Sequence, residues 1–247
     1  MVPFLVLTVK AAYKRVNFWV LTAVVCALCV LAHFYDLFSL GEVSTLFPEV
    51  YAGLALLVVI LAPVFCFGDH LEREAAGAAA LWRTRPVAPA SLVFGVLVGT
   101  TLMTWAILAA LAATFYVTSL LAGALTPAAT HLVLPLALPA AFCSCGLVLL
   151  LAPRVGLVAT IVILLSIFAA SHMIPYFSAS SPRLLAVGAL LPNFHVSNVQ
   201  SLIAVGRLPS SAHLFAALLS PLLYAAACCA LALHLERRRY RTADGRP

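Results

Sequence analysis

Six long apolar runs constrain this chain more than any other feature of its sequence. They cover residues 16–38, 50–67, 92–121, 132–152, 155–174 and 214–235. Because an α-helix rises 1.5 Å per residue, about 20 apolar residues cross a hydrocarbon layer of about 30 Å. The runs lack the polar residue at every second position that strands of a membrane barrel would carry. The sequence therefore predicts an all-α, polytopic membrane protein with six transmembrane helices in a single domain, residues 1–247.

The positive charges predict the orientation of these helices. With six crossings, both termini share one side, and all of the 14 Lys and Arg residues except Arg183 and Arg207 fall on that side. Because loops rich in Lys and Arg stay in the cytoplasm, we expect a multi-pass protein of the inner membrane with both termini cytoplasmic. Residues 236–247 then form a basic cytoplasmic tail. Contact with membrane lipids explains the net charge of +6 without nucleic acid.

Residues 69–91, DHLEREAAGAAALWRTRPVAPAS, hold charges that cannot lie in the bilayer, since each would cost about 3 kcal/mol there. Acidic residues come first, alanines follow, and basic residues precede Pro86. That order suits the helix dipole and the high helix propensity of alanine, so a short cytoplasmic helix is predicted over 71–84. Such a helix is either an interfacial connector, with Trp82 at headgroup depth, or a docking helix for a cytoplasmic partner.

The order of these features resembles the half-size, six-span permease subunits of type-two ATP-binding-cassette (ABC) exporters. The loop of that family reads E-x-x-x-G-T-L-x-x-L-L-x-x-P-V-S-R, followed by V-L-G-K. Glu72 or Glu74, Gly77, Leu81, Pro86, Val87 and Gly95 stand at the corresponding places. Ala90, Ser91 and Val96 depart from the pattern. The later LPNFHVSN and the terminal LHLERRRY are similar to the family's L-P-N-x-x-x-F-x and F-x-R-R-E.

The resemblance implies a coupling helix seated on an ATPase subunit. The residues expected to contact that subunit are Glu72, Glu74, Gly77, Leu81, Arg83, Arg85 and Pro86. It further implies a second permease copy or paralogue as partner, and ATP and Mg²⁺ bound by the ATPase instead of this chain. Residues 1–15 resemble the family's amphipathic interface helix, with Phe4, Leu5, Val9, Ala12, Tyr13 and Val16 on one side; a frayed tail is the alternative.

The chain itself lacks the residues of an energy-converting site. A phosphate-binding loop needs a lysine near glycines, and the two lysines, Lys10 and Lys14, have none nearby. No acid lies near the middle of a predicted span, which disfavours proton or sodium coupling. We therefore expect no catalytic residue and no cofactor in this chain. The alternatives are an ATPase-independent channel or scaffold, and an intramembrane enzyme, for which no catalytic set is present.

Hydroxyl groups form a mild polar set within the predicted spans, which favours an amphipathic or hydrophobic substrate if they line a path. The set consists of Thr100, Thr101, Thr104, Ser144, Thr160, Ser166, Ser171 and Ser220. The same hydroxyls can instead bond helix to helix.

The outer segment 175–211 is too long for a tight turn and still apolar. Pro192, Asn193 and Phe194 mark a predicted re-entrant or interfacial element, followed by a short helix that Ser197 caps and Gly206 ends. An amphipathic helix lying on the surface is the alternative. Five histidines fall on this side, and His172 and His195 are weak candidates for a metal site. The simpler interpretation is that histidine is tolerated at membrane interfaces.

Overall fold

The computed structural model describes residues 2–38, 46–75, 88–123, 126–178, 191–192 and 194–243, and every regular element among them is helical. In chain order these elements are α1 (Val2–Lys14), α2 (Val16–Phe38), α3 (Leu46–Ala75), α5 (Pro89–Leu121), η1 (Ala128–Leu132), α6 (Val133–Ser178), η2 (Phe194–Ser197), α8 (Gln200–Val205) and α9 (Ser211–Ala243). The prediction of an all-α chain is confirmed for this part of the protein.

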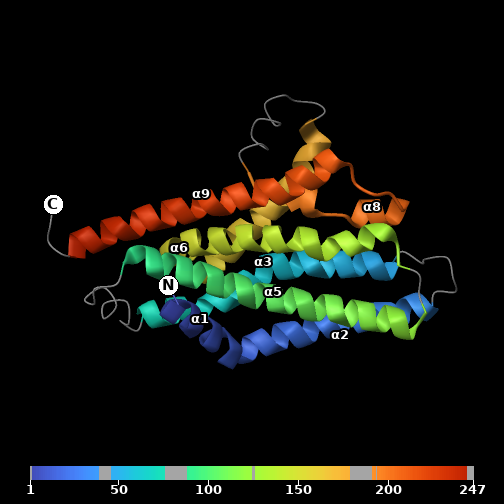
Figure 1. Cartoon of the computed structure of the whole chain (residues 1–247), viewed down its shortest axis with the longest axis horizontal. Helices are drawn as coiled ribbons and strands as arrows, with labels where there is room; N and C mark the ends of the chain where they lie inside the picture. Colours follow the sequence, from blue (N-terminus) through green and yellow to red (C-terminus); the bar gives the residue numbers. More distant parts are fainter. Residues whose placement is uncertain are drawn as a thin grey trace.

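Five of these helices, α2, α3, α5, α6 and α9, are long and apolar enough to cross a membrane. The fourth and fifth predicted spans form one 46-residue element, α6, instead of two separate helices. Within α6, Gly156 leaves helical geometry, with φ 80° and ψ 168°. Glycine tolerates this positive φ because it has no Cβ atom. Figure 1 shows that α6 reverses direction within its length, so the predicted break survives as a sharp kink.

The centre of the bundle consists of α3 and α5, which lie side by side (Figure 1). Most residues of their apolar windows are buried, whereas most residues of the windows of α2, α6 and α9 are not. Small side chains let α6 and α9 approach closely: a Cβ added to Gly146 would lie 3.3 Å from the Cα of Ala225. Such contacts suit packing in lipid, where van der Waals contact drives helix association. All seven cysteines are free.

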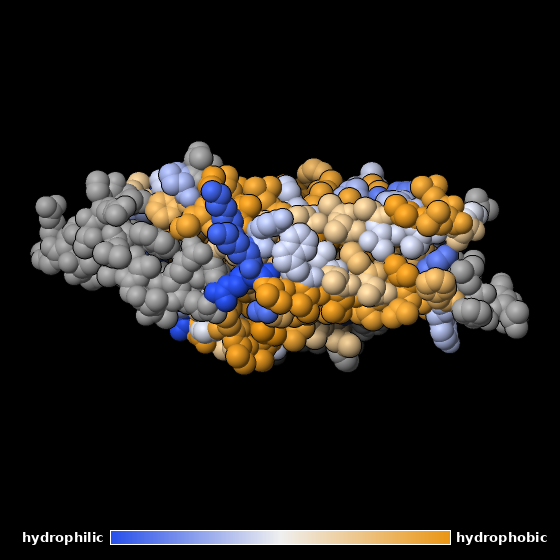
Figure 2. Space-filling model, turned by 90° about the horizontal axis from the view of Figure 1, so that it is seen from below, coloured by the Kyte–Doolittle hydropathy of each residue, from blue (hydrophilic) through white to orange (hydrophobic). Residues whose placement is uncertain are grey.

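The N-terminal helix α1 packs against α5 with a face that overlaps the predicted apolar side, since Phe4 and Val9 pack against the core. Thr8, Ala11 and Ala12 are its buried residues, whereas Tyr13 is 57% exposed. A Cβ added to Gly99 of α5 would lie 2.7 Å from the Cβ of Thr8, so the missing side chain at this position permits the crossing. Figure 2 shows the molecule from below. Hydrophilic side chains gather on this side where α1 lies, and hydrophobic surface covers much of the length of α2.

Two helices extend beyond their predicted spans. The second span was expected over 50–67, but α3 continues to Ala75, so the first residues of the predicted 71–84 helix continue α3 without a break. The last span was expected to end at residue 235, but α9 continues to Ala243. Residues 236–243 of the predicted basic tail are therefore helical and continue the last span.

The bundle has two chemically different ends. We call one the basic end: α1 and α2 begin there, α3 ends, α5 begins, α6 kinks and α9 ends (Figure 1). It carries the basic residues Lys10, Lys14, Arg15, Arg154, Arg237, Arg238 and Arg239. The other is the histidine end, where η1, η2, α8 and the start of α9 gather, with His33, His131, His172, His195 and His213.

Candidate functional site

The predicted coupling residues fall between α3 and α5 at the basic end. Glu72 and Glu74 belong to the last turns of α3. Helix α5 begins after Ala88, with Pro89 at its first position. Proline suits this position because a first-turn N–H has no partner within the helix, so its absence costs no hydrogen bond. The other predicted contact residues lie outside the described residues, namely Gly77, Leu81, Arg83, Arg85 and Pro86. The charged segment is therefore bounded on both sides by regular helices.

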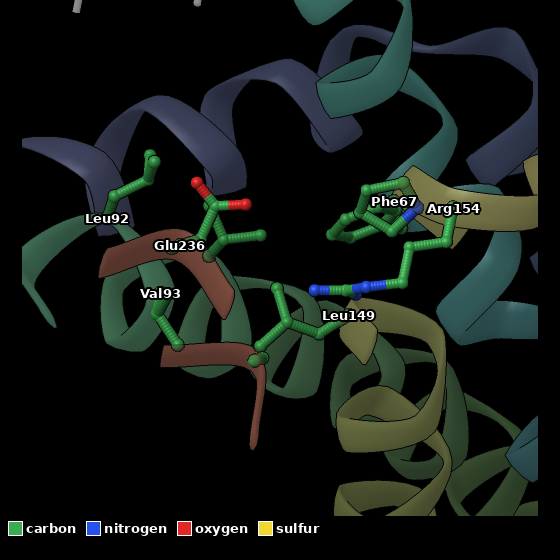
Figure 3. Close-up of a pocket in the computed structure, with 9 residues that line it drawn as sticks. Phe67, Leu92, Val93, Leu149, Arg154 and Glu236 are labelled. Carbon is green, nitrogen blue, oxygen red and sulfur yellow. The ribbon is translucent and has the colours of Figure 1, made fainter. Parts of the chain in front are cut away.

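A small pocket, which we call the basal pocket, lies between four helices at the basic end (Figure 3). Its walls come from four helices: Phe67 from α3, Leu92, Val93 and Val96 from α5, Leu149, Pro153 and Arg154 from α6, and Ala232 and Glu236 from α9. Phe67 and Leu92 almost directly precede and follow the charged segment in the chain. The cavity has a volume of about 20 Å³, enough for roughly one water molecule.

Glu236 supplies a buried carboxylate to the basal pocket. The residue is only 9% exposed, and its Oε1 accepts a hydrogen bond of 3.0 Å from the Nη1 of Arg239. Its Oε2 is buried and has no hydrogen-bond partner within the described part of the chain. A buried polar atom without a partner costs about 1–3 kcal/mol, so this oxygen is a candidate to receive a donor from water or from another residue.

Glu236 was not predicted as a site residue, because it falls within the predicted basic tail. A signal was present in the spacing of small residues along α9. Its buried positions recur every three or four residues: Ala217, Pro221, Ala225, Cys228, Cys229, Ala232 and Glu236. A helix that keeps this period places Glu236 on the face directed at the bundle.

Arg154 enters the same pocket from α6. Figure 3 shows its guanidinium and the Glu236 carboxylate on facing sides of the pocket. The Nη1 of Arg154 donates a hydrogen bond to the carbonyl of Leu150, one turn earlier. Opposite charges interact strongly where protein replaces water. The pocket therefore brings a positive and a negative side chain to one cavity, and its described residues include no nucleophile paired with a base.

At the histidine end, the predicted re-entrant segment is compact. Pro192 is buried, Phe194 starts η2 and is 2% exposed, and Asn193 lies outside the described residues. The short helices expected before the last span are present as η2 and α8. The second begins at Gln200, so Ser197 is not its N-cap, and the N–H of Gln200 donates to the Oδ1 of Asn198 at 3.0 Å. Gly206 ends α8 in the left-handed conformation, as predicted.

Side chains anchor these short elements to the long helices. The Nε2 of Gln200 donates to the carbonyl of Glu49 in α3 at 3.0 Å. Gln200 lies against Gly53, where an added Cβ would come within 2.9 Å of its Nε2. His213 in α9 donates from Nε2 to the carbonyl of Val196 at 2.8 Å. The outer segment is therefore tied to α3 and α9 by hydrogen bonds to backbone carbonyls.

The two weak metal candidates, His172 and His195, do come together. Their ring centroids are 5.5 Å apart, with the rings edge to face. The Nδ1 of His172 lies 2.9 Å from the carbonyl of Phe168, which only accepts, so Nδ1 carries the proton. Its Nε2 then accepts from the Nδ2 of Asn198 at 3.2 Å. No cluster of three or more metal-binding side chains occurs among the described residues.

Burial and two neighbouring imidazoles act on His195. Burial lowers the pKa of His195, and the imidazoles of His172 and His213 lower it further. Its Nδ1 is buried without a partner in the described structure. These surroundings therefore favour the neutral form of His195.

Five of the hydroxyl groups within the predicted spans form hydrogen bonds inside their own helices. Thr100, Thr101, Thr104, Thr160 and Ser166 each donate to the carbonyl four residues earlier in their own helix. In hydrocarbon this carbonyl is the nearest available acceptor. Thr104 also reaches another helix, since its Oγ1 lies 3.8 Å from the Sγ of Cys145 in α6.

No known protein family, curated protein or solved structure matches this chain. Its function is therefore inferred from its own residues and their geometry.

Proposed function

We propose that this chain is the membrane-spanning permease subunit of an ATP-driven exporter of the type-two ABC kind. One observation carries the proposal: the charged segment 69–91 joins α3 and α5, the two long helices with the largest buried share of residues. A force applied to that segment acts directly on the centre of the bundle. The ATPase, which would bind ATP and Mg²⁺, would contact Glu72, Glu74, Gly77, Leu81, Arg83, Arg85 and Pro86.

The basal pocket supports this role because residues immediately before and after the segment line it. Phe67 and Leu92, on either side of the segment, pack around the same cavity as Glu236 and Arg154. Interiors packed this closely transmit displacement because they have few voids to absorb it. A movement of the segment would therefore reach α6 and α9 as well as α3 and α5. Glu236 and Arg154 would act as positioning residues, since nothing places them at a reacting group.

In the proposed topology the chain crosses the inner membrane six times, with the two halves of α6 as the fourth and fifth crossings. Both termini and the basic end then lie in the cytoplasm, in agreement with the distribution of Lys and Arg. Val20, Val24, Leu28 and Leu31 are 42–61% exposed and form a continuous apolar stripe on α2. This stripe fits membrane lipid or a second permease copy, with the translocation path formed between the two copies.

Affinity purification in mild detergent tests the proposal. An ATP-binding-cassette ATPase should co-purify with the wild type and be lost from the double variant Glu74→Arg, Arg85→Glu. Arg207→Glu is the control, because Arg207 is an exposed charge at the opposite end of the bundle. If no ATPase accompanies the wild type under conditions that preserve membrane complexes, the exporter hypothesis is wrong. An ATPase-independent channel or scaffold would then be favoured.

A further inference from the structure

A hydrophobic groove opens on the side of the bundle between α5 and α9. Helix α5 contributes Val98, Leu102 and Trp105 to the lining. Helix α9 contributes Leu218 and Leu222, and α6 contributes Phe142. The groove has a volume of about 390 Å³. Sites for small organic ligands cover about 300–1,000 Å³, so this groove is large enough to hold one.

A hydrogen bond between α5 and α6 holds the groove open. The indole Nε1 of Trp105 donates to the carbonyl of Leu138 at 3.0 Å. This bond fixes the ring as part of the wall and prevents it from turning into the groove. Since a side chain held in one rotamer does not collapse into the neighbouring space, the groove is preformed.

The lining selects for hydrocarbon. Two of its side chains, Thr101 and Trp105, carry a polar hydrogen, and both hydrogens are already used inside the protein. Thr101 donates to the carbonyl of Leu97 at 2.8 Å, and Trp105 donates to that of Leu138. A ligand that placed a polar group here would lose hydrogen bonds without replacing them. The occupant must therefore be apolar where it touches the groove.

The position of the groove identifies the source of such an occupant. Every lining residue lies more than one helical turn from the ends of α5, α6 and α9. Leu102, Leu218 and Leu222 are 42–44% exposed, so the groove opens sideways. At this depth the surrounding medium consists of lipid acyl chains. A helix from a second copy, about 10 Å across, would fill this volume within roughly one turn, whereas an acyl chain is thin enough to lie along it.

We propose that this groove binds one acyl chain of a bilayer phospholipid. An empty groove would deprive its walls of van der Waals contacts, and a hydrocarbon chain restores them. The bound chain bridges α5 and α9 across α6, and it thereby sets the spacing of these helices. The site does not depend on the exporter function proposed above.

Photo-crosslinking of the full chain tests the site. The protein is reconstituted in phosphatidylcholine nanodiscs that contain a trace of phosphatidylcholine with a diazirine at mid-length in one acyl chain. Illumination, proteolysis and mass spectrometry then locate the adducts. In the wild type, adducts should concentrate on peptides that contain the groove residues of α5, α6 and α9.

Two neighbouring residues of α9 provide a matched pair of variants. Leu222→Trp fills the groove and should reduce adducts there about tenfold, the change expected for a loss of about 1.4 kcal/mol in affinity. Leu223→Trp adds the same bulk at a lipid-exposed residue that does not line the groove, and should leave the adducts unchanged. Leu218→Phe, a smaller filling change, should give an intermediate loss, and melting temperatures identify any variant that fails to fold.

Three results would overturn the proposal. Adducts could follow surface exposure evenly around the bundle, as they would for bulk lipid. They could persist unchanged in both filling variants that fold. Finally, Leu218→Cys could form a rapid disulfide with a second copy while lipid adducts are absent, and the groove would then be an interface between copies.

Discussion

The two ends of the bundle are held by different interactions. At the basic end the described contacts involve ions: Arg239 bonds the buried Glu236, and Arg154 shares the basal pocket with it. At the histidine end, His172 bonds a backbone carbonyl and Asn198, and Gln200 bonds another carbonyl in α3. The comparison indicates that one helix bundle can secure one end with an ion pair, where we propose a partner, and the other end with hydrogen bonds to carbonyl and amide groups that hold short elements in place.

Reversing the charge of Glu236 should destabilise the basic end more than any other change proposed here. Glu236→Lys places a buried cation beside Arg154 and Arg239, and we expect the free energy of unfolding to fall by about 3 kcal/mol. Unfolding in SDS followed by circular dichroism measures this loss. Glu236→Gln keeps the shape of the side chain and should cost less. Equal stability of the two variants would show that charge does not secure this end.

Removing His172 should break the histidine end to a smaller extent. His172→Phe preserves the ring but leaves the carbonyl of Phe168 and the amide of Asn198 without their partner, which costs about 1–2 kcal/mol. The same SDS titration measures the loss. His131→Phe is the control, since His131 is exposed and bonds only the hydroxyl of Tyr116 among the described groups. If both variants lose the same stability, the His172 contacts have no special role.

The histidine end should also respond to acid. Because the pKa of His195 is lowered from 6.5, the folded chain resists a proton that the unfolded chain accepts. Stability contributed by neutral His195 is therefore fully present above pH 6.5 and is lost as the pH falls from 6.5 toward the lowered pKa. The imidazoles facing it among the described residues are those of His172 and His213.

Melting temperatures measured between about pH 5 and pH 8 test this dependence, because that range spans the ordinary histidine pKa. His195→Gln should flatten the profile below pH 6.5 and leave it unchanged above. His131→Gln should keep the wild-type profile. If the melting temperature of His195→Gln still falls below pH 6.5 as in the wild type, groups other than His195 cause the loss of stability.

The smallest effect should be the coupling between Glu236 and Arg239. Arg239 is 37% exposed, so solvent screens the pair, and a double-mutant cycle with glutamine at both positions should give about 0.5–1 kcal/mol. The coupling should decrease as salt is raised. A coupling energy near zero at low salt would mean that the ion pair between Glu236 and Arg239 does not stabilise the basic end, and that only the burial of the carboxylate sets this end apart.

Much of the architecture follows from the sequence alone. The length of each apolar run predicts the long helices, and α2 begins and ends at the predicted residues 16 and 38. Gly206 ends α8 as expected, and the break between the fourth and fifth runs appears as the kink at Gly156. These features are local, because hydrophobic length and backbone freedom depend on the residues of one segment.

The candidate sites were less predictable. Glu236 looks like part of a basic tail until α9 extends past it and buries its carboxylate against three other helices. The face that α1 buries depends on the space left by Gly99 in a helix far along the chain. His172 and Asn198 meet because η2 packs on α6. The length of the apolar runs, which the sequence alone gives, indicates a membrane protein. Only the tertiary structure decided which polar atoms are buried and what they bond, because a hydrogen-bond partner is set by helices that are distant in sequence.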